Sequence, residues 1–187
     1  MTIEGRRSLE GFIFLVTFGL TIPAANWMIG NVGTKCIPNG PCLIPVAPGI
    51  LAPSGVLMIG IALVLRDLVQ RRLGMGYAIG AVAVGALISA ALAPPALVIA
   101  SGLAFLLSEA ADLAVYTPLA RRGLVLAVAA SSLVGLIVDS VVFLWLAFAS
   151  LEFLGGQILG KAWMVLLSIP FVAYLRRRDE RLGLSQA

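Results

Sequence analysis

Residues 101–148 read SGLAFLLSEAADLAVYTPLARRGLVLAVAASSLVGLIVDSVVFLWLAF. Two long apolar segments in this stretch are joined by a short basic turn, TPLARRG. Three carboxylates, Glu109, Asp112 and Asp139, lie inside the apolar segments. A carboxylate in hydrocarbon is costly unless it faces a partner or a water-filled cavity. The stretch therefore predicts two membrane-spanning helices that carry either a functional site or paired polar contacts.

The whole chain has the composition of an integral membrane protein. Its 187 residues are 60% hydrophobic and 12% charged, with a mean hydropathy of +1.06. No ordinary soluble domain has this composition. A membrane-spanning helix needs about 20 apolar residues, so we expect six spans with short loops and no room for an ATPase, a kinase or a nucleic-acid-binding module.

We therefore predict an all-α integral membrane protein, with residues 1–187 forming a single domain of six transmembrane helices. The expected spans are residues 11–29, 49–65, 77–92, 96–116, 124–149 and 157–175. Residues 30–48 are rich in Gly and Pro and are expected to form a loop. Pro53 removes a backbone donor, so we expect the outer half of the second span to be irregular.

The basic residues are distributed on one side of this six-span arrangement. That side holds Arg6, Arg7, Arg66, Arg71, Arg72, Arg121, Arg122, Arg176, Arg177, Arg178 and Arg181. The other side has Lys35, and Lys161 falls inside the sixth span. Because loops rich in Lys and Arg stay in the cytoplasm, we expect both termini there, in a bacterial inner membrane. The net charge of +4 then reflects topology and not a nucleic-acid partner.

Two cysteines, Cys36 and Cys42, share the first external loop. An oxidising periplasm would allow a disulfide between them; two unpaired thiols are the alternative. A metal site is not expected, because the chain has no His and no further Cys. The absence of His also removes a Ser-His dyad and a histidine proton relay. We expect no enzyme activity, no catalytic residue and no cofactor.

The polar residues of the spans form two layers when depth is counted at about 1.5 Å per helical residue. Asn26, Asp139 and Lys161 lie in an outer layer, and Glu109 and Asp112 lie deeper. One interpretation is a substrate cavity that opens outward and is floored by Glu109. The alternative is structural: Lys161 pairs with Asp139, and Asn26 hydrogen-bonds a neighbouring helix.

Two further sets of charges have the same two interpretations. Arg66 and Asp67 close the second span and are candidates for a cytoplasmic gate, with a snorkelled ion pair as the alternative. Asp112 lies near the cytoplasmic end of its span, where Arg121 or Arg122 could reach it.

Several motifs along the chain match one family in order and in topology. They are residues 52–55 (APSG) leading to 66–67 (RD), 108–112 (SEAAD) before 115–116 (VY), 131–143 (SSLVGLIVDSVVF), and 160–161 (GK) with Pro170. With these motifs the chain resembles, over nearly its whole length, the VUT or YhhQ family of six-span bacterial queuosine precursor transporters.

The resemblance implies import of 7-deazaguanine bases such as preQ0 and preQ1. A carboxylate such as Glu109 can accept two hydrogen bonds from a guanine-like edge, and an aminomethyl cation would need a second carboxylate. Asn26 or Lys161 could donate to the carbonyl group of the base. Phe105, Phe143 or Trp163 could stack on its ring. Without an ATPase, transport would be facilitated or coupled to an ion.

Three other functions remain open at this point. The chain could be the substrate-binding membrane subunit of an ATP-driven vitamin uptake system, like the six-span S-components. It could be an intramembrane enzyme, or it could be a structural or assembly subunit. Its partners in the transporter interpretation are a purine-like small molecule and the lipid bilayer, and a homodimer is compatible with the sequence.

Overall fold

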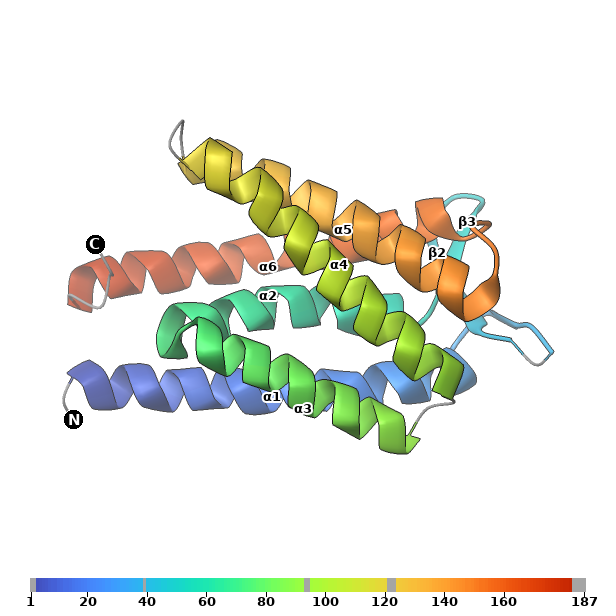
Figure 1. The fold of residues 1–187 in the computed structure, drawn as a ribbon, viewed down its shortest axis with the longest axis horizontal. Helices are drawn as coiled ribbons and strands as arrows, with labels where there is room; N and C mark the ends of the chain where they lie inside the picture. The colour runs from blue at the N-terminus through green and yellow to red at the C-terminus, as the bar shows by residue number, and fades with distance from the viewer. Residues whose placement is uncertain (1–2, 39, 93–94, 121–123, 183–187) are drawn as a thin grey trace.

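A computed structural model describes residues 3–38, 40–92, 95–120 and 124–182 of the chain. This part is mostly helical. Its six helices are α1 (Ile3–Asn31), α2 (Val56–Leu73), α3 (Met75–Leu92), α4 (Pro95–Ala120), α5 (Leu124–Phe148) and α6 (Leu154–Leu182). Figure 1 shows that the start of α1 and the end of α6 lie at one end of the molecule, and that a small sheet lies at the other.

The predicted all-α architecture is wrong in the segment that follows α1. Three short antiparallel strands replace the expected loop and the outer part of the second span: β1 (Lys35–Cys36), β2 (Cys42–Ala47) and β3 (Ile50–Pro53). β3 ends at Pro53, which lies opposite Leu43 in the sheet. Proline has no backbone N–H to donate, and the end of an edge strand tolerates this loss better than the interior of a helix does. The helix α2 therefore begins only at Val56, after the proline.

A single residue, Gly74, separates α2 from α3. Its backbone has φ 98° and ψ 170°, and its N–H donates to the carbonyl of Gln70 at 2.8 Å. Side chains other than hydrogen rarely tolerate this φ, so a glycine allows α2 to stop and the chain to reverse at once. The tight reversal makes α2 and α3 neighbours (Figure 1).

Glycines also determine how closely α6 approaches α2. A Cβ on Gly60 would lie 2.7 Å from Cβ of Met164, and a Cβ on Gly160 would lie 2.6 Å from Cγ1 of Val56. Both distances are too short for a larger side chain at an unchanged helix spacing. The two glycines therefore let the α2 and α6 backbones come together directly beside Lys161.

The outer surface of the described bundle is strongly apolar. Leu87 is 71% exposed, Leu167 is 69% exposed and Leu20 is 63% exposed. Large contiguous apolar surfaces are unusual on soluble monomers and mark contact with lipid or with other proteins. Among the described residues, two helices, α1 and α6, are by length and composition able to cross a bilayer.

A cluster of ion pairs ties α1, α2 and α6 together at the end that carries the termini. Nη2 of Arg72 lies 2.8 Å from Oδ1 of Asp179 and 2.9 Å from Oε2 of Glu10. Arg178 reaches the same Glu10 oxygen at 2.6 Å, and Arg71 reaches Asp179 at 3.3 Å. The side chains of Arg72 and Asp179 are almost completely buried, so this cluster joins three helices that are distant in sequence.

Candidate functional site

A cavity of about 180 Å³ lies between the helices and is lined by residues from all six. One water molecule needs about 10–15 Å³ in this measure, so the cavity has room for a small organic molecule. Most of its wall is apolar. The polar and charged side chains among its lining residues are Asn26, Arg66, Ser101, Asp139, Gln157 and Lys161.

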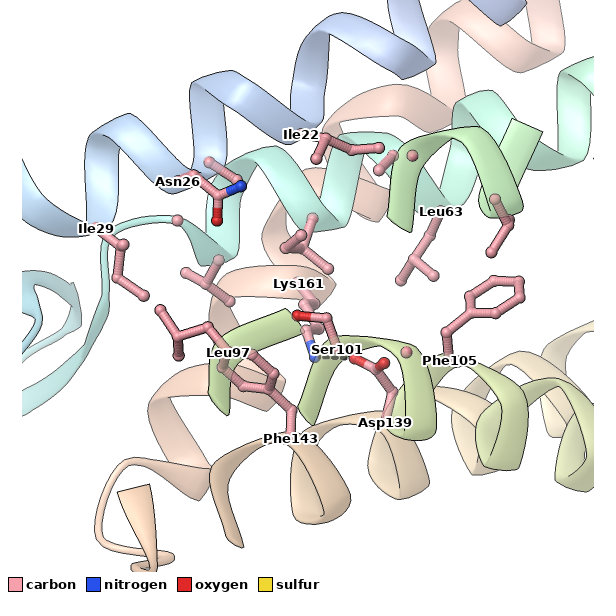
Figure 2. A pocket seen from close by; sticks show the side chains of 18 of the residues that line it. Ile22, Asn26, Ile29, Leu63, Leu97, Ser101, Phe105, Asp139, Phe143 and Lys161 are labelled. Carbon is pink, nitrogen blue, oxygen red and sulfur yellow. Dashed lines mark hydrogen bonds and ion pairs between the residues drawn. The ribbon is translucent and has the colours of Figure 1, made fainter. Parts of the chain in front are cut away.

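An ion pair between α5 and α6 forms part of the wall of this cavity (Figure 2). Nζ of Lys161 donates to Oδ2 of Asp139 at 2.5 Å and to Oγ of Ser140 at 2.9 Å. Ser140 passes its own hydroxyl hydrogen to the carbonyl of Leu136 at 2.8 Å, which leaves its oxygen free to accept from Lys161. The lysine side chain is 1% exposed, whereas that of Asp139 is 16% exposed. The carboxylate is therefore the more accessible member of the pair.

The pair combines the two interpretations that the sequence left open. Lys161 and Asp139 do form the structural contact between α5 and α6. The same two residues also line the cavity. They can therefore join the two helices and still contact a bound ligand. Burial of an ion pair is costly unless the remaining donors and acceptors are satisfied, and Ser140 meets part of that need.

Other predicted residues surround the pair. Asn26 reaches toward the cavity from α1, while Phe105 of α4 and Phe143 of α5 appear on either side of Asp139 in Figure 2. The ring of Phe143 also meets Phe148 edge to face, with ring centroids 6.0 Å apart. An amide and two aromatic rings around a charged pair offer both hydrogen bonding and apolar contact to a planar ligand.

The deeper carboxylates are placed differently. Asp112 faces α5, where its Oδ1 lies 3.6 Å from the position that a Cβ would take on Gly135; it is not among the residues that line the cavity. Glu109 belongs to α4 and lies one turn beyond Phe105, which lines the cavity. The side chain of Glu109 lies outside the part of the chain that the structure describes, so its predicted role as the floor stays a prediction.

Trp163 is not brought to the cavity. Its indole Nε1 donates to the carbonyl of Val46 at 3.0 Å, and its side chain is about half exposed. The indole therefore fastens α6 to β2 of the small sheet. Its predicted stacking on a substrate has no support from this placement.

Arg66 and Asp67 form a local pair within α2. Nε and Nη2 of Arg66 donate to Oδ1 of Asp67 at 3.0 and 2.6 Å. Arg66 also lines the cavity, whereas the Asp67 side chain is 58% exposed and does not. The predicted ion pair is present, but its predicted place at a helix end is wrong, because α2 continues to Leu73. Arg66 therefore lines the cavity from inside α2 while it is paired with Asp67.

Sequence reasoning did not include Gln157 and Ser101 among the binding residues. Gln157 is 3% exposed and lies one turn before Lys161, and Ser101 lies one turn before Phe105. Residues four apart share a helix face, so Gln157 lies on the face of Lys161 and Ser101 on that of Phe105, and this spacing is the signal that points to both.

The sheet lies at the end of the cavity remote from the termini. Its last strand leads through Pro53 into Gly55, and both residues line the cavity. Cys36 and Cys42 pair across β1 and β2 and form a disulfide. Within the described residues, no group of three or more metal-ligating side chains comes together.

Comparison with known proteins gives one match. The family model described as "Putative vitamin uptake transporter" matches residues 89–175, which include α4, α5 and most of α6. No curated protein and no solved structure matches the chain. The matched part contains Phe105, Asp139, Phe143 and Lys161. Over the part that carries the central ion pair, the chain is therefore similar to a family of vitamin uptake transporters.

Proposed function

We propose that the chain is a transporter of the bacterial inner membrane that imports a queuosine precursor, a 7-deazaguanine base such as preQ0 or preQ1. The observation that carries the proposal is the cavity among six helices, with an ion pair in its otherwise mostly apolar wall. The match of residues 89–175 to an uptake family supports the general function. The resemblance of the motifs suggests the substrate.

The chemistry of the cavity suits such a base. Asp139 can accept from ring N–H groups, Lys161 and Asn26 can donate to a carbonyl, and Phe105 and Phe143 supply aromatic surface. The cavity is smaller than the roughly 300–1,000 Å³ typical of pockets for drug-sized ligands. A bicyclic base is therefore a more suitable occupant than a larger vitamin.

A membrane location with both termini in the cytoplasm is part of the proposal. It is supported by the exposed leucines on the helices and by the start of α1 and the end of α6, which lie at one end of the bundle (Figure 1). Both of these segments are rich in arginine. Reporter fusions after Arg72, Arg122 and Arg178 should all report the cytoplasm. A periplasmic signal from any of them would refute the six-span arrangement.

The direct test of function is uptake of labelled preQ0 and preQ1. The host should be a bacterial strain that can neither make these bases nor import them, so that accumulation depends on the expressed chain. We expect uptake with the wild-type chain and a strong loss with Asp139→Asn at equal membrane levels. Glu152→Gln is a matched control, because Glu152 is an exposed carboxylate that does not line the cavity, and it should retain uptake. No uptake by a well-expressed wild-type chain would refute the proposed substrate.

A second function is favoured by the description of the matching family, which refers to vitamin uptake. The chain would then be the substrate-binding subunit of an ATP-driven system, similar to an S-component. The two functions differ in their dependence on a separate energy-coupling module. Uptake in a host that lacks every such module would exclude the subunit function.

A further inference from the structure

We infer that the Asp139–Lys161 pair presents a single donor–acceptor edge to the substrate and selects a neutral planar heterocycle over its cationic analogue. The inference rests on the proposed function, because it concerns how the same cavity distinguishes between bases. The inference specifies that the substrate is neutral and names the edge of the substrate that contacts Asp139 and Lys161.

The first step concerns the hydrogen-bonding groups that the pair leaves available. An ammonium group has three donors, and Lys161 uses two of them on Asp139 and Ser140. Oδ2 of Asp139 is engaged by the lysine, while Oδ1 has no partner among the described residues. One N–H of Lys161 and Oδ1 of Asp139 are therefore available for a ligand, and both residues line the cavity.

The second step concerns the ligand edge that matches this arrangement. A heterocycle with a ring N–H next to a carbonyl presents a donor and an acceptor in the same plane. The N–H would donate to Oδ1 of Asp139, and the carbonyl would accept from Nζ of Lys161. Both bonds involve a charged partner, which makes them stronger than bonds between neutral groups. Phe105 and Phe143 would border the ring (Figure 2).

The third step concerns charge. Among the described side chains that line the cavity, the charged ones are Arg66, which is paired with Asp67, and the two members of the Lys161–Asp139 pair. The ammonium of Lys161 is 1% exposed and already neutralises Asp139. A cationic ligand would have to displace this ammonium or remain near it. Because the ammonium group is almost completely buried, such repulsion is larger there than between charges in bulk water.

The test compares two bases of nearly the same shape. preQ0 carries a neutral nitrile, and preQ1 carries an aminomethyl group that is protonated at neutral pH. Their affinities for the purified wild-type chain in lipid nanodiscs should differ by about tenfold or more in favour of preQ0, because even a partly screened contact between like charges is worth that ratio. Lys161→Met removes the internal cation, so the ratio should move at least about tenfold toward preQ1.

A matched control separates the local effect from a change in net charge. Arg71→Met also removes one positive charge, but Arg71 lies in the ion-pair cluster at the other end of α2 and does not line the cavity. The preQ0 to preQ1 ratio should be unchanged in this variant. An equal shift in both variants would overturn the inference, as would an unchanged ratio in Lys161→Met.

A ligand-side measurement covers the case in which Lys161→Met does not fold. A preQ0 derivative methylated on the ring nitrogen next to the carbonyl lacks the donor that should meet Asp139. Binding to the wild-type chain should weaken by about tenfold or more, since Oδ1 loses its partner and meets a methyl group. Unchanged binding of this derivative would overturn this inference but not the proposed substrate. A wild-type chain that binds neither base would overturn the proposed substrate as well.

Discussion

Replacement of Asp179 by Asn should destabilise the bundle far more than loss of an exposed carboxylate does. Asp179 follows the apolar segment 157–175, and its side chain is fully buried against Arg72, Arg71 and Arg178. Asn keeps the shape and one acceptor oxygen but removes the charge. The variant therefore leaves three guanidinium groups around a neutral side chain, with the carboxylate of Glu10 still paired with Arg72 and Arg178.

The size of the effect follows from the burial of Arg72, whose side chain is 2% exposed. Removal of one partner of a buried ion pair typically costs 3–5 kcal/mol, so we expect about 3 kcal/mol. The lower end applies because Arg72 keeps its contact with Glu10 at 2.9 Å. For a protein of this length, about 3 kcal/mol corresponds to a decrease in Tm of roughly 6–12 °C.

The assay is thermal unfolding of the purified protein in detergent, with Asp67→Asn as the control. Asp67 is also a carboxylate paired with an arginine, but its side chain is 58% exposed. Exposed pairs contribute about 0–1 kcal/mol, so the control should change Tm by only a few degrees. Similar Tm values for the two variants would refute the view that the buried cluster ties α1, α2 and α6 together.

The same cluster predicts a pH dependence. Burial raises the pKa of the Asp179 carboxyl, but hydrogen bonds and charges from Arg72, Arg178 and Arg71 outweigh it and hold the pKa below its usual range. A depressed pKa stabilises the fold above the unfolded value of about 3.9, and this contribution is lost as the pH falls through the folded value. Between about pH 5 and 8 the difference in Tm between wild type and Asp179→Asn should therefore be constant.

Three further predictions concern the cavity and its surroundings. If Glu109 accepts two hydrogen bonds from the substrate, Glu109→Gln should weaken binding by about 30- to 1000-fold, or roughly 2–4 kcal/mol; near-normal affinity in a well-expressed variant would remove Glu109 from the site. Alkylation without reductant should label neither Cys36 nor Cys42 in protein from the native envelope, and two labelled thiols by mass spectrometry would refute the disulfide there. Gly160→Leu should abolish binding because its side chain would collide with Val56 and displace α6, whereas retained affinity would show that α2 can yield.

The composition of the chain and the lengths of its apolar segments were enough to predict six helices and most of their positions. Long apolar segments separated by charged or Gly-Pro turns leave few other ways to satisfy the backbone in an apolar environment. The same reasoning failed at residues 35–53, where strands form. This short stretch mixes Pro with β-branched residues and has no helical periodicity. Whether it forms paired strands depends on contacts across the sheet between separate segments, which the order of residues in any one segment does not specify.

The pairing of Asp139 with Lys161 was foreseeable as one of two alternatives, because both lie at similar depth on adjacent helices. Only the tertiary structure decided that the pair both joins α5 to α6 and faces the cavity. Depth follows from the count of residues along a helix, but the direction of a side chain depends on how each helix is rotated about its axis. The packing of small residues such as Gly60 and Gly160 sets that rotation. For the same reason Trp163, two residues beyond Lys161, points away from the cavity and holds the sheet.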